Sequence, residues 1–132
     1  MGRSLAVIVL DTSVLLYWAF NHAELSRSAL LTIQQADAIL ISSISLWEIA
    51  LKEKQGKLIL PITPRAMAAR LHSVYRVQTK PVDDEIWLTS VELSWTHRDP
   101  ADRVIVATAQ TQGCPLVTQD LTIRDFYPAA IW

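Results

Sequence analysis

Short apolar runs alternate with amphipathic segments along the whole chain. Residues 5–10 (LAVIVL) are almost continuously apolar, which predicts a strand that is covered on both faces in a parallel sheet. Further strands are predicted at residues 38–42 and 116–118, with a weaker strand inside residues 75–82 and an edge strand at residues 131–132. We expect residues 5–10 to form the central strand of the sheet.

Helical periodicity fills the segments between these strands. Ser45 with Glu48 three residues later forms a capping-box pattern at the start of one helix, and Gly56 suits its carboxyl-terminal cap. Asp99-Pro100 predicts the start of a long late helix. The alternation of strands and helices predicts right-handed crossovers and a parallel sheet with helices on both faces. The predicted helices cover residues 14–20, 26–36, 45–56, 63–73, 83–94 and 99–112.

The size and composition of the chain indicate one globular unit. Its 132 residues correspond to a single domain over residues 1–132. Apolar residues make up 51% and charged residues 19% of the sequence, which argues against disorder. The formal net charge is -1, so the overall charge gives no attraction to a nucleic acid. Any affinity for a polyanion must therefore come from local basic groups and bound metal.

Two features predict where the protein works. Cys114 is the single cysteine, so the chain cannot form an internal disulfide, and a reducing cytoplasm is the expected location. Residues 5–20 are apolar enough to resemble a signal peptide or a membrane span, but Asp11, Thr12 and Ser13 interrupt them. We therefore expect a cytoplasmic protein that does not bind a membrane.

Acidic residues follow strands or begin helices at four places. Asp11 and Asp120 come shortly after predicted strands, while Glu48 and Asp102 lie in the predicted first turns of helices. In a parallel sheet, ligands bind beyond the carboxyl ends of the strands, where such side chains can converge. Converging carboxylates repel one another, and hard divalent ions compensate that repulsion and activate water against a phosphodiester. The pattern therefore predicts a nuclease that depends on one or two metal ions.

Several residues near these acids also have a structural interpretation. Glu48 fits a capping box, and Asp99 suits a helix cap better than a metal site, with Asp102 as the reciprocal acid of that cap. Thr118 is a secondary candidate, for a hydroxyl contact with metal-bound water or phosphate. Arg103 is placed either to contact phosphate or to pair with a neighbouring acid. The sequence alone leaves these alternatives open.

The remaining polar residues give weaker signals. His22, His72 and His97 lack the spacing of metal ligands, so we interpret them as surface or structural residues, with His97 the one placed near the acids. Basic residues that flank the expected crevice are candidates for phosphate contacts, although helix-surface lysines are usually solvated: Lys52, Lys54, Lys57, Arg65 and Arg70.

Four segments contain the acidic candidates and follow one another along the chain: VIVLDTSVLL, ISSISLWEIALKEKQGKL, HRDPADRVIVATAQ and PLVTQD. In this order and at these separations they resemble the PIN-domain family, and more narrowly the VapC-like toxins of bacterial toxin-antitoxin pairs. The resemblance implies a three-layer α/β/α sandwich with a central parallel sheet. It also implies Mg²⁺- or Mn²⁺-dependent cleavage of RNA at an acidic site that consists of Asp11, Glu48, Asp102 and Asp120.

The same resemblance implies two protein partners. One is a small cognate antitoxin whose flexible segment wraps an apolar groove, and the other is a second copy of the chain in a homodimer. The sequence contains five tryptophans, most of which we expect in or near the core. Trp18 with Leu15, and Trp47 with Leu51, are candidates for an apolar groove beside the acidic pocket.

Two other functional classes remain open at this point. One is a catalytically silent PIN-fold binding module, in which the acidic positions are expected to decay, yet all four are present. The other is an aspartate-based phosphatase or phosphoacceptor domain. A phosphatase of the haloacid dehalogenase type requires a second aspartate two residues after the first, where this chain has Ser13.

Overall fold

The sheet of the computed structural model, which describes residues 5–132, has five parallel strands in the order β3-β2-β1-β4-β5. The predicted parallel sheet and the central place of the first strand are confirmed. Pairing of Val9 with both Leu40 and Leu116 fixes the register around the centre. The strands are β1 (Val7–Leu10), β2 (Ala38–Ser42), β3 (Val77–Lys80), β4 (Leu116–Val117) and β5 (Ala130–Ile131).

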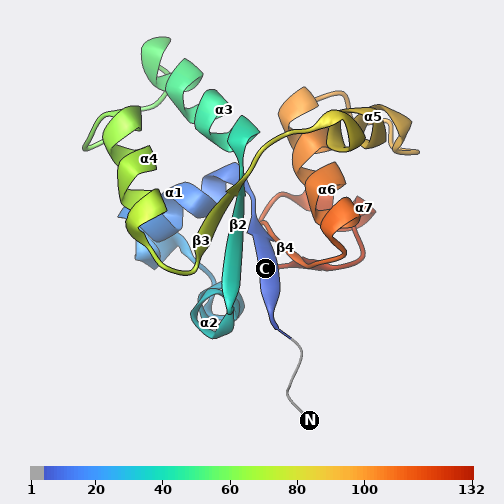
Figure 1. Cartoon of the computed structure of the whole chain (residues 1–132), viewed down its shortest axis with the longest axis horizontal. Helices are drawn as coiled ribbons and strands as arrows, with labels where there is room; N and C mark the ends of the chain where they lie inside the picture. The colour runs from blue at the N-terminus through green and yellow to red at the C-terminus, as the bar shows by residue number, and fades with distance from the viewer. Residues whose placement is uncertain (1–4) are drawn as a thin grey trace.

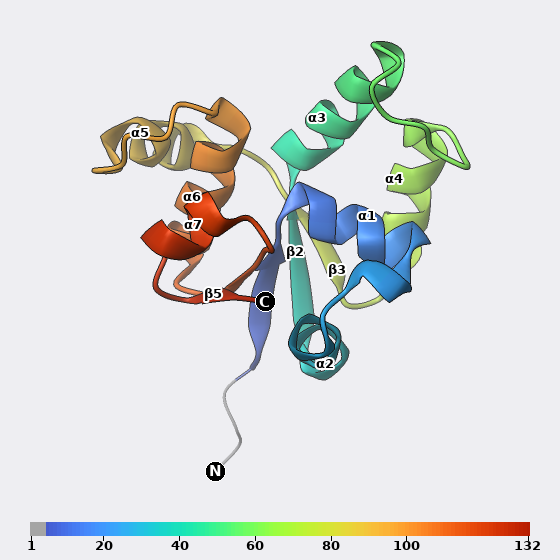
Figure 2. The ribbon, with the colours of Figure 1, turned by 180° about the vertical axis from the view of Figure 1, so that it is seen from behind.

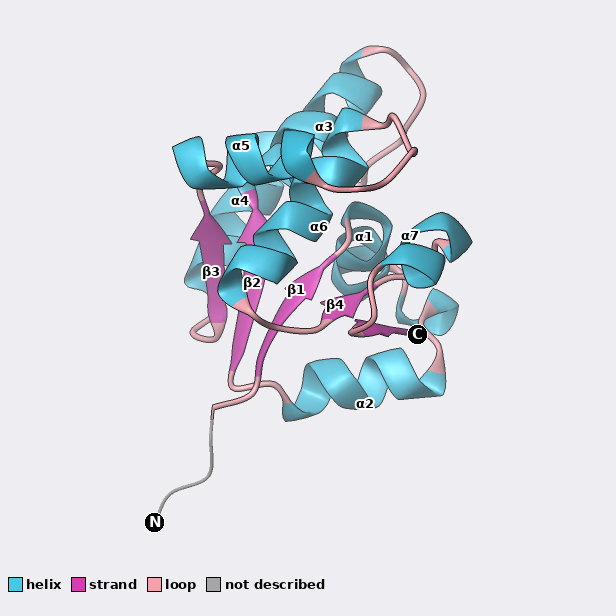
Figure 3. Cartoon of the chain, turned by 90° about the vertical axis from the view of Figure 1, so that its right-hand side faces the viewer, coloured by secondary structure: helices cyan, strands magenta, loops and turns pink. Residues whose placement is uncertain are grey.

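Helices cover both faces of this sheet. Figures 1 and 2 show α1, α3 and α4 on one side, and α5, α6 and α7 on the other. Figure 3 shows α2 beside the amino-terminal ends of the strands, with α3 and α5 near their carboxyl ends. The helices are α1 (Thr12–Phe20), α2 (Arg27–Gln35), α3 (Ser43–Lys54), α4 (Pro64–Ser73), α5 (Asp84–Glu92), α6 (Pro100–Gln112) and α7 (Leu121–Phe126), and a short 3₁₀ helix, η1, covers His22–Glu24. Within the described residues, none of these helices has the length and apolar character needed to cross a bilayer.

Each face of the sheet has its own apolar cluster, because successive residues of a strand point to opposite sides. Ile8 and Leu10 of β1 pack into the cluster that contains buried residues of α1, α2, α3 and α4. Val9 packs into the second cluster, with buried residues of α5, α6 and α7. This double burial explains why β1 is almost continuously apolar in the sequence.

The helix α3 begins earlier than the capping-box pattern predicts. Ser42, the last residue of β2, is its N-cap, and the Ser42 hydroxyl accepts a hydrogen bond from the backbone N–H of Ile44. Ser45 therefore lies inside the helix, and its hydroxyl bonds to that of Thr12 at 2.8 Å. The predicted Ser45–Glu48 capping box is wrong, because Ser42, three residues earlier, caps the helix. Glu48 therefore lies in the second turn of α3.

Two further differences concern the ends of the chain. Strand β1 is shorter than predicted, since Leu5 is 75% exposed and lies before its first residue. The helix α7 was not predicted at all, although Asp120 ahead of a mixed polar and apolar segment is a recognisable N-cap.

The topology creates a crevice between β1 and β4. The chain leaves β1 through α1 and returns on one side at β2, whereas β4 lies on the other side of β1. Such a reversal of strand order leaves room beyond the carboxyl ends of the two strands. Asp11 follows β1 and Asp120 follows β4, so both predicted acids lie at this crevice.

Candidate active site

The predicted acids converge on one pocket at the carboxyl ends of the strands. The pocket has a volume of about 780 Å³ and also exposes the side chains of Lys52 and Lys57 at its walls. Its acidic lining residues are Asp11, Glu48, Asp99, Asp102 and Asp120. The arrangement brings together residues from the junction of β1 and α1, from α3, from the start of α6 and from the turn after β4.

Asp11 is the most buried of these acids. Its side chain is held by two donors: the backbone N–H of Thr12 at 2.8 Å on Oδ1, and the hydroxyl of Thr118 at 2.7 Å on Oδ2. Asp11 is only 6% exposed, and this burial is the main reason why its pKa rises from 3.8 to about 6. The hydrogen bond from Thr118 opposes the rise, and the charges of Asp102 and Asp120 add to it. A buried carboxylate in this setting is stabilised by a proton or by a cation.

Thr118 connects Asp11 to the turn after β4. Its hydroxyl donates to Asp11 and accepts a hydrogen bond from the backbone N–H of Asp120 at 3.1 Å. Thr118 is completely buried, so no exposed hydroxyl remains for the predicted contact with water or phosphate. The residue instead fixes the relative positions of two acids that come from different ends of the chain.

Asp99 and Asp102 have different roles within the same motif. Asp99 is the N-cap of α6, where its carboxylate accepts from the backbone N–H of Asp102 at 2.9 Å, so the predicted cap is confirmed. The Asp102 side chain does not return this bond but lies 2.7 Å from Nε2 of His97. Burial is the main cause of a raised pKa for Asp102, while the hydrogen bond with His97 opposes it. The only sequence signal for His97 was its place just before this motif.

Glu48 and Asp120 are held by their own helices. Glu48 forms an ion pair with Lys52, one turn further along α3, at 3.3 Å. Asp120 caps α7, and its Oδ1 accepts from the backbone N–H groups of Thr122 and Ile123. Both carboxylates therefore line the pocket while they have local partners.

The predicted roles of Arg103 as a phosphate contact or an acid partner are wrong. Its guanidinium donates to the backbone carbonyls of residues in the segment 90–97 instead. These bonds hold the half-buried side chain against α5 and the following loop, and Arg103 does not line the acidic pocket. Backbone carbonyls at the end of a helix are not visible in a sequence pattern, which explains the error.

The oxygen-rich pocket fits a hydrated divalent ion better than a closed protein cage. Within residues 5–132, no group of three or more His, Cys, Asp or Glu side chains is arranged so that it could hold one metal ion. The pocket nevertheless offers carboxylate oxygens from four elements, and Asp11 is destabilised as a free anion. Mg²⁺ usually keeps several of its waters and binds through one or two carboxylates. The donor set therefore suits Mg²⁺ or Mn²⁺ bound partly through water.

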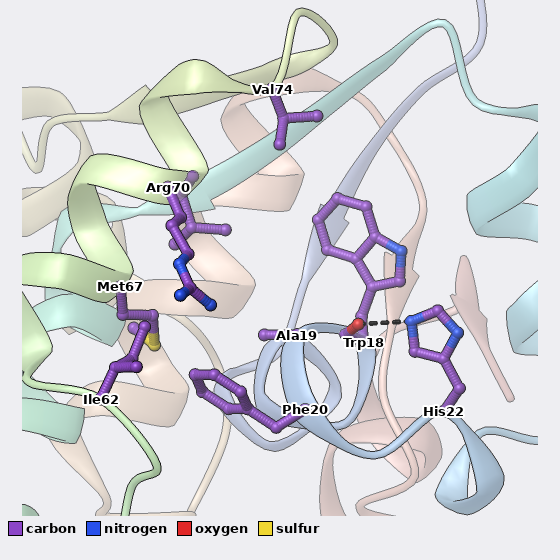
Figure 4. Close-up of a pocket in the computed structure, with 9 residues that line it drawn as sticks. Trp18, Ala19, Phe20, His22, Ile62, Met67, Arg70 and Val74 are labelled. Atoms are coloured by element: carbon purple, nitrogen blue, oxygen red, sulfur yellow. Dashed lines mark hydrogen bonds between the residues drawn. The ribbon is translucent and has the colours of Figure 1, made fainter.

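The predicted apolar groove does not exist as one surface. Leu15 is completely buried in the core, and Trp18 and Trp47 line different pockets. Trp18 lies in a pocket of about 300 Å³ between α1 and α4, where Figure 4 shows its indole and the Phe20 ring across from Met67 and Arg70. The Trp47 pocket is lined by Ser43, Ile44, Trp47, Val82, Trp87 and Pro100.

Comparison with known proteins agrees with the fold. The family model described as PIN domain matches residues 8–127. The chain belongs to the PIN-domain family. This PIN-domain chain is also 31% identical over 132 residues to the protein named Ribonuclease VapC22 from Mycobacterium tuberculosis. The alignment covers 97% of this chain and 100% of the relative. The predicted family is therefore confirmed.

Solved structures share the three-layer PIN fold. A chain of a toxin-antitoxin complex from Klebsiella pneumoniae aligns with a TM-score of 0.67 at 19% identity, covering 95% of this chain and 96% of that chain. A chain of the DNA-bound VapBC complex from Salmonella typhimurium aligns with a TM-score of 0.66 at 21% identity, covering 96% of both chains. The sarcin-ricin loop cleaving toxin VapC20 from Mycobacterium tuberculosis gives 0.63 at 19% identity, covering 89% of this chain and 93% of that chain. These similarities confirm the predicted sandwich.

Proposed function

We propose that this PIN-domain protein is a VapC-type ribonuclease, the toxin of a toxin-antitoxin pair, that hydrolyses RNA phosphodiester bonds with Mg²⁺ or Mn²⁺. The observation that carries the proposal is the single pocket lined by Asp11, Glu48, Asp102 and Asp120. The relative Ribonuclease VapC22 supports the activity through its name. We further propose that residues 1–132 act as one catalytic domain and work in the cytoplasm, where RNA is the substrate.

The residues of the pocket have distinct tasks in this reaction. Asp11 and Asp102 would hold the ion, and Asp120 and Glu48 would hold it or its waters. When bound, a divalent ion lowers the pKa of a coordinated water and compensates charge on the phosphate. Thr118 keeps Asp11 in one orientation, which reduces the reorganisation needed during the reaction. Lys52 and Lys57 line the same pocket and are placed to attract the phosphate backbone.

Induction in cells tests this function directly. Wild type, Asp11→Asn and the control Asp125→Asn are expressed from an inducible promoter, and growth and RNA fragments are followed. Asp125 is exposed on α7 outside the acidic pocket, so its variant controls for a lost surface charge. Wild type and Asp125→Asn are expected to arrest growth and produce discrete RNA fragments, whereas Asp11→Asn does neither. Equal growth arrest by Asp11→Asn and wild type would contradict a nuclease toxin.

One observation favours the second candidate function, a catalytically silent binding module. The acids of residues 5–132 do not form a ready three-ligand metal site. A silent module would give no RNA fragments with any of the three proteins, so the induction experiment separates the two functions. Membership in the PIN family leaves the alternative of an aspartate-based phosphatase or phosphoacceptor without support.

A cognate antitoxin is the protein partner that we propose. Similar chains occur in structures described as toxin-antitoxin complexes. The apolar pocket of Trp18 and Phe20 is open beside the cation of Arg70, which suits an apolar segment that carries a carboxylate (Figure 4). Co-expression with the cognate antitoxin is expected to restore growth. Trp18→Ala is expected to weaken this rescue. An unchanged rescue would argue against this pocket as the binding site of the antitoxin.

A second copy of the chain is the other partner that we propose. Trp47 on α3 and Trp87 on α5 are exposed around one apolar pocket, and Leu88 and Val91 extend the apolar surface along α5. An apolar surface of this kind is typical of a protein interface. Sedimentation is expected to show a homodimer that Trp87→Glu dissociates, and a monomeric wild type would refute it.

A further inference from the structure

His97 contacts the Asp102 carboxylate but is not among the residues that line the acidic pocket. Its Nε2 atom is 2.7 Å from Oδ2 of Asp102, and the two side chains are 27% and 19% exposed. Since an ionised carboxylate only accepts hydrogen bonds, Nε2 donates to Asp102 in its charged form. We propose that His97 is a positioning residue of the metal site: it occupies Oδ2 so that Asp102 presents Oδ1 to the ion. This inference rests on the proposed function, because it assigns Asp102 to that site.

Aromatic packing fixes the ring of His97. The His97 ring lies 4.8 Å from the ring of Trp95, measured between centroids, at an angle of 41°. Trp95 also contacts Phe126 of α7, whose ring stacks on it at a centroid distance of 4.6 Å and an interplanar angle of 10°. The imidazole thus packs on an aromatic side chain that is itself fixed to another helix. This restricts the directions in which Nε2 can donate.

Arg103 fixes the backbone of the same segment. One guanidinium nitrogen, Nη1, donates to the carbonyls of Trp95 at 2.6 Å and of His97 at 3.0 Å. The planar guanidinium has rigidly placed donors, so it holds several carbonyls in one arrangement. The remaining bonds of Arg103 go to the carbonyls of Ser90, Val91 and Leu93. The position of His97 relative to α6 is therefore fixed through both its ring and its backbone.

A positioning role makes a different prediction from a role in folding. Carboxylates that bind metal ions are commonly held by a second layer of hydrogen bonds, and loss of such a partner typically weakens metal binding by about 10- to 100-fold. A single polar contact between partly exposed side chains adds little to folding stability. Loss of the His97 donor should therefore lower metal affinity with little change in the fold.

Replacement of the donor tests this role. Mn²⁺ binding to the purified protein is measured by electron paramagnetic resonance of the free ion, for His97→Leu, which cannot donate, and His97→Gln, which can. His97→Leu is expected to weaken Mn²⁺ binding by about 10- to 100-fold, and His97→Gln to remain within about 3-fold of wild type. The matched control is His72→Leu, because His72 bonds to Thr79 at 3.0 Å outside the acidic pocket. This control is expected to bind Mn²⁺ like wild type.

Each result decides a different point. If His97→Leu binds Mn²⁺ as tightly as wild type, or if His97→Gln is as weak as His97→Leu, the positioning role is overturned while the proposed nuclease stands. If the wild type binds no Mn²⁺, the proposed metal-dependent function fails, and this inference fails with it. Circular dichroism checks the fold of each variant. Should His97→Leu not fold, His97→Asn, which is too short to reach Asp102, replaces it with the same expected loss.

Discussion

Asp11 and Glu48 line the same pocket but are held in opposite ways. Asp11 is buried, and one of its two donors, Thr118, comes from 107 residues away in the chain. Glu48 is paired with Lys52 on the next turn of its own helix, and the Lys52 side chain is 51% exposed. The pKa of Asp11 is raised to about 6, chiefly by burial. The buried acid depends on the whole fold and forms no ion pair with a cation of residues 5–132, whereas the helix acid is paired with Lys52.

This difference indicates that a bound metal ion would stabilise Asp11 more than Glu48. A charge removed from water is stabilised strongly by a bound cation, because the surroundings screen it poorly. An exposed pair is screened by solvent and contributes little. Substitutions at the buried acid should therefore have large effects on activity and stability, and substitutions at the helix pair should have small ones.

The largest expected effect is the loss of RNA cleavage in Asp11→Asn. Removal of a group that stabilises charge in the transition state commonly costs 100- to 1,000-fold, and we expect a loss of about 1,000-fold in kcat/KM here. Glu48→Gln is expected to lose about 10-fold in kcat/KM. This is the lower end of the range of about 10- to 100-fold for groups that support a metal site through another ligand. Cleavage of a fluorescent RNA by purified, antitoxin-free protein measures both, with Asp125→Asn as control. A greater loss in Glu48→Gln than in Asp11→Asn would reverse the comparison.

The next effect is a fall in the stability of the metal-free protein as the pH rises. Between pH 3.8 and about 6 the folded state binds more protons than the unfolded state, because the pKa of Asp11 is raised on folding. The free energy of unfolding therefore decreases across this window, and the change in pKa corresponds to about 3 kcal/mol. The raised pKa of Asp102 acts in the same direction.

Urea unfolding in chelator at several pH values measures this dependence. Asp11→Asn is expected to be more stable than wild type above pH 6 and to lose most of that advantage below pH 4, since the neutral side chain does not titrate. Parallel pH profiles for the two proteins would show that Asp11 is not the buried acid responsible.

A smaller effect is expected for Thr118→Val, which keeps the shape of the side chain but removes its hydroxyl. The variant loses the hydrogen bonds to Asp11 and from the backbone of Asp120. We expect a loss of about 1 to 3 kcal/mol in unfolding free energy and about 10-fold in cleavage. Thr111→Val is the control, because the Thr111 hydroxyl bonds only to the carbonyl of Thr108 in the same helix. Full activity in Thr118→Val would show that Asp11 needs no such support.

The smallest effect is expected for Lys52→Ala. The Lys52 side of its pair with Glu48 is exposed to solvent, so the free energy of unfolding should change by less than about 1 kcal/mol. Cleavage should fall only a few-fold, and the salt dependence of RNA binding should become slightly weaker. A loss of stability and cleavage as large as that of Thr118→Val would show that the pair of Glu48 and Lys52 supports the fold and the site.

The sequence was sufficient to predict the sheet and the acids attached to its strands. A nearly unbroken apolar run such as residues 5–10 has few places in a fold other than a central parallel strand, although the strand proper begins at Val7. The carboxyl ends of parallel strands meet at one edge, so Asp11 and Asp120 were placed correctly.

The positions that depend on competition between nearby partners were not predictable in the same way. Several serines near the start of α3 could each have capped it, and the tertiary contact of Ser45 with Thr12 decided against the predicted one. The bonds of Arg103 go to backbone carbonyls, and those carbonyls have no signature in the side-chain sequence. Nothing in the sequence indicates that Trp18 and Trp47 line different pockets, because that depends on where α1 and α3 lie in the fold.

The most direct test is cleavage of RNA by the purified wild type, freed of any antitoxin, in a titration of Mg²⁺ or Mn²⁺ against excess chelator. We predict no cleavage in chelator, recovery on addition of either ion, and no recovery in Asp11→Asn. Undiminished cleavage by the wild type in excess chelator would contradict a metal-dependent site built from these carboxylates.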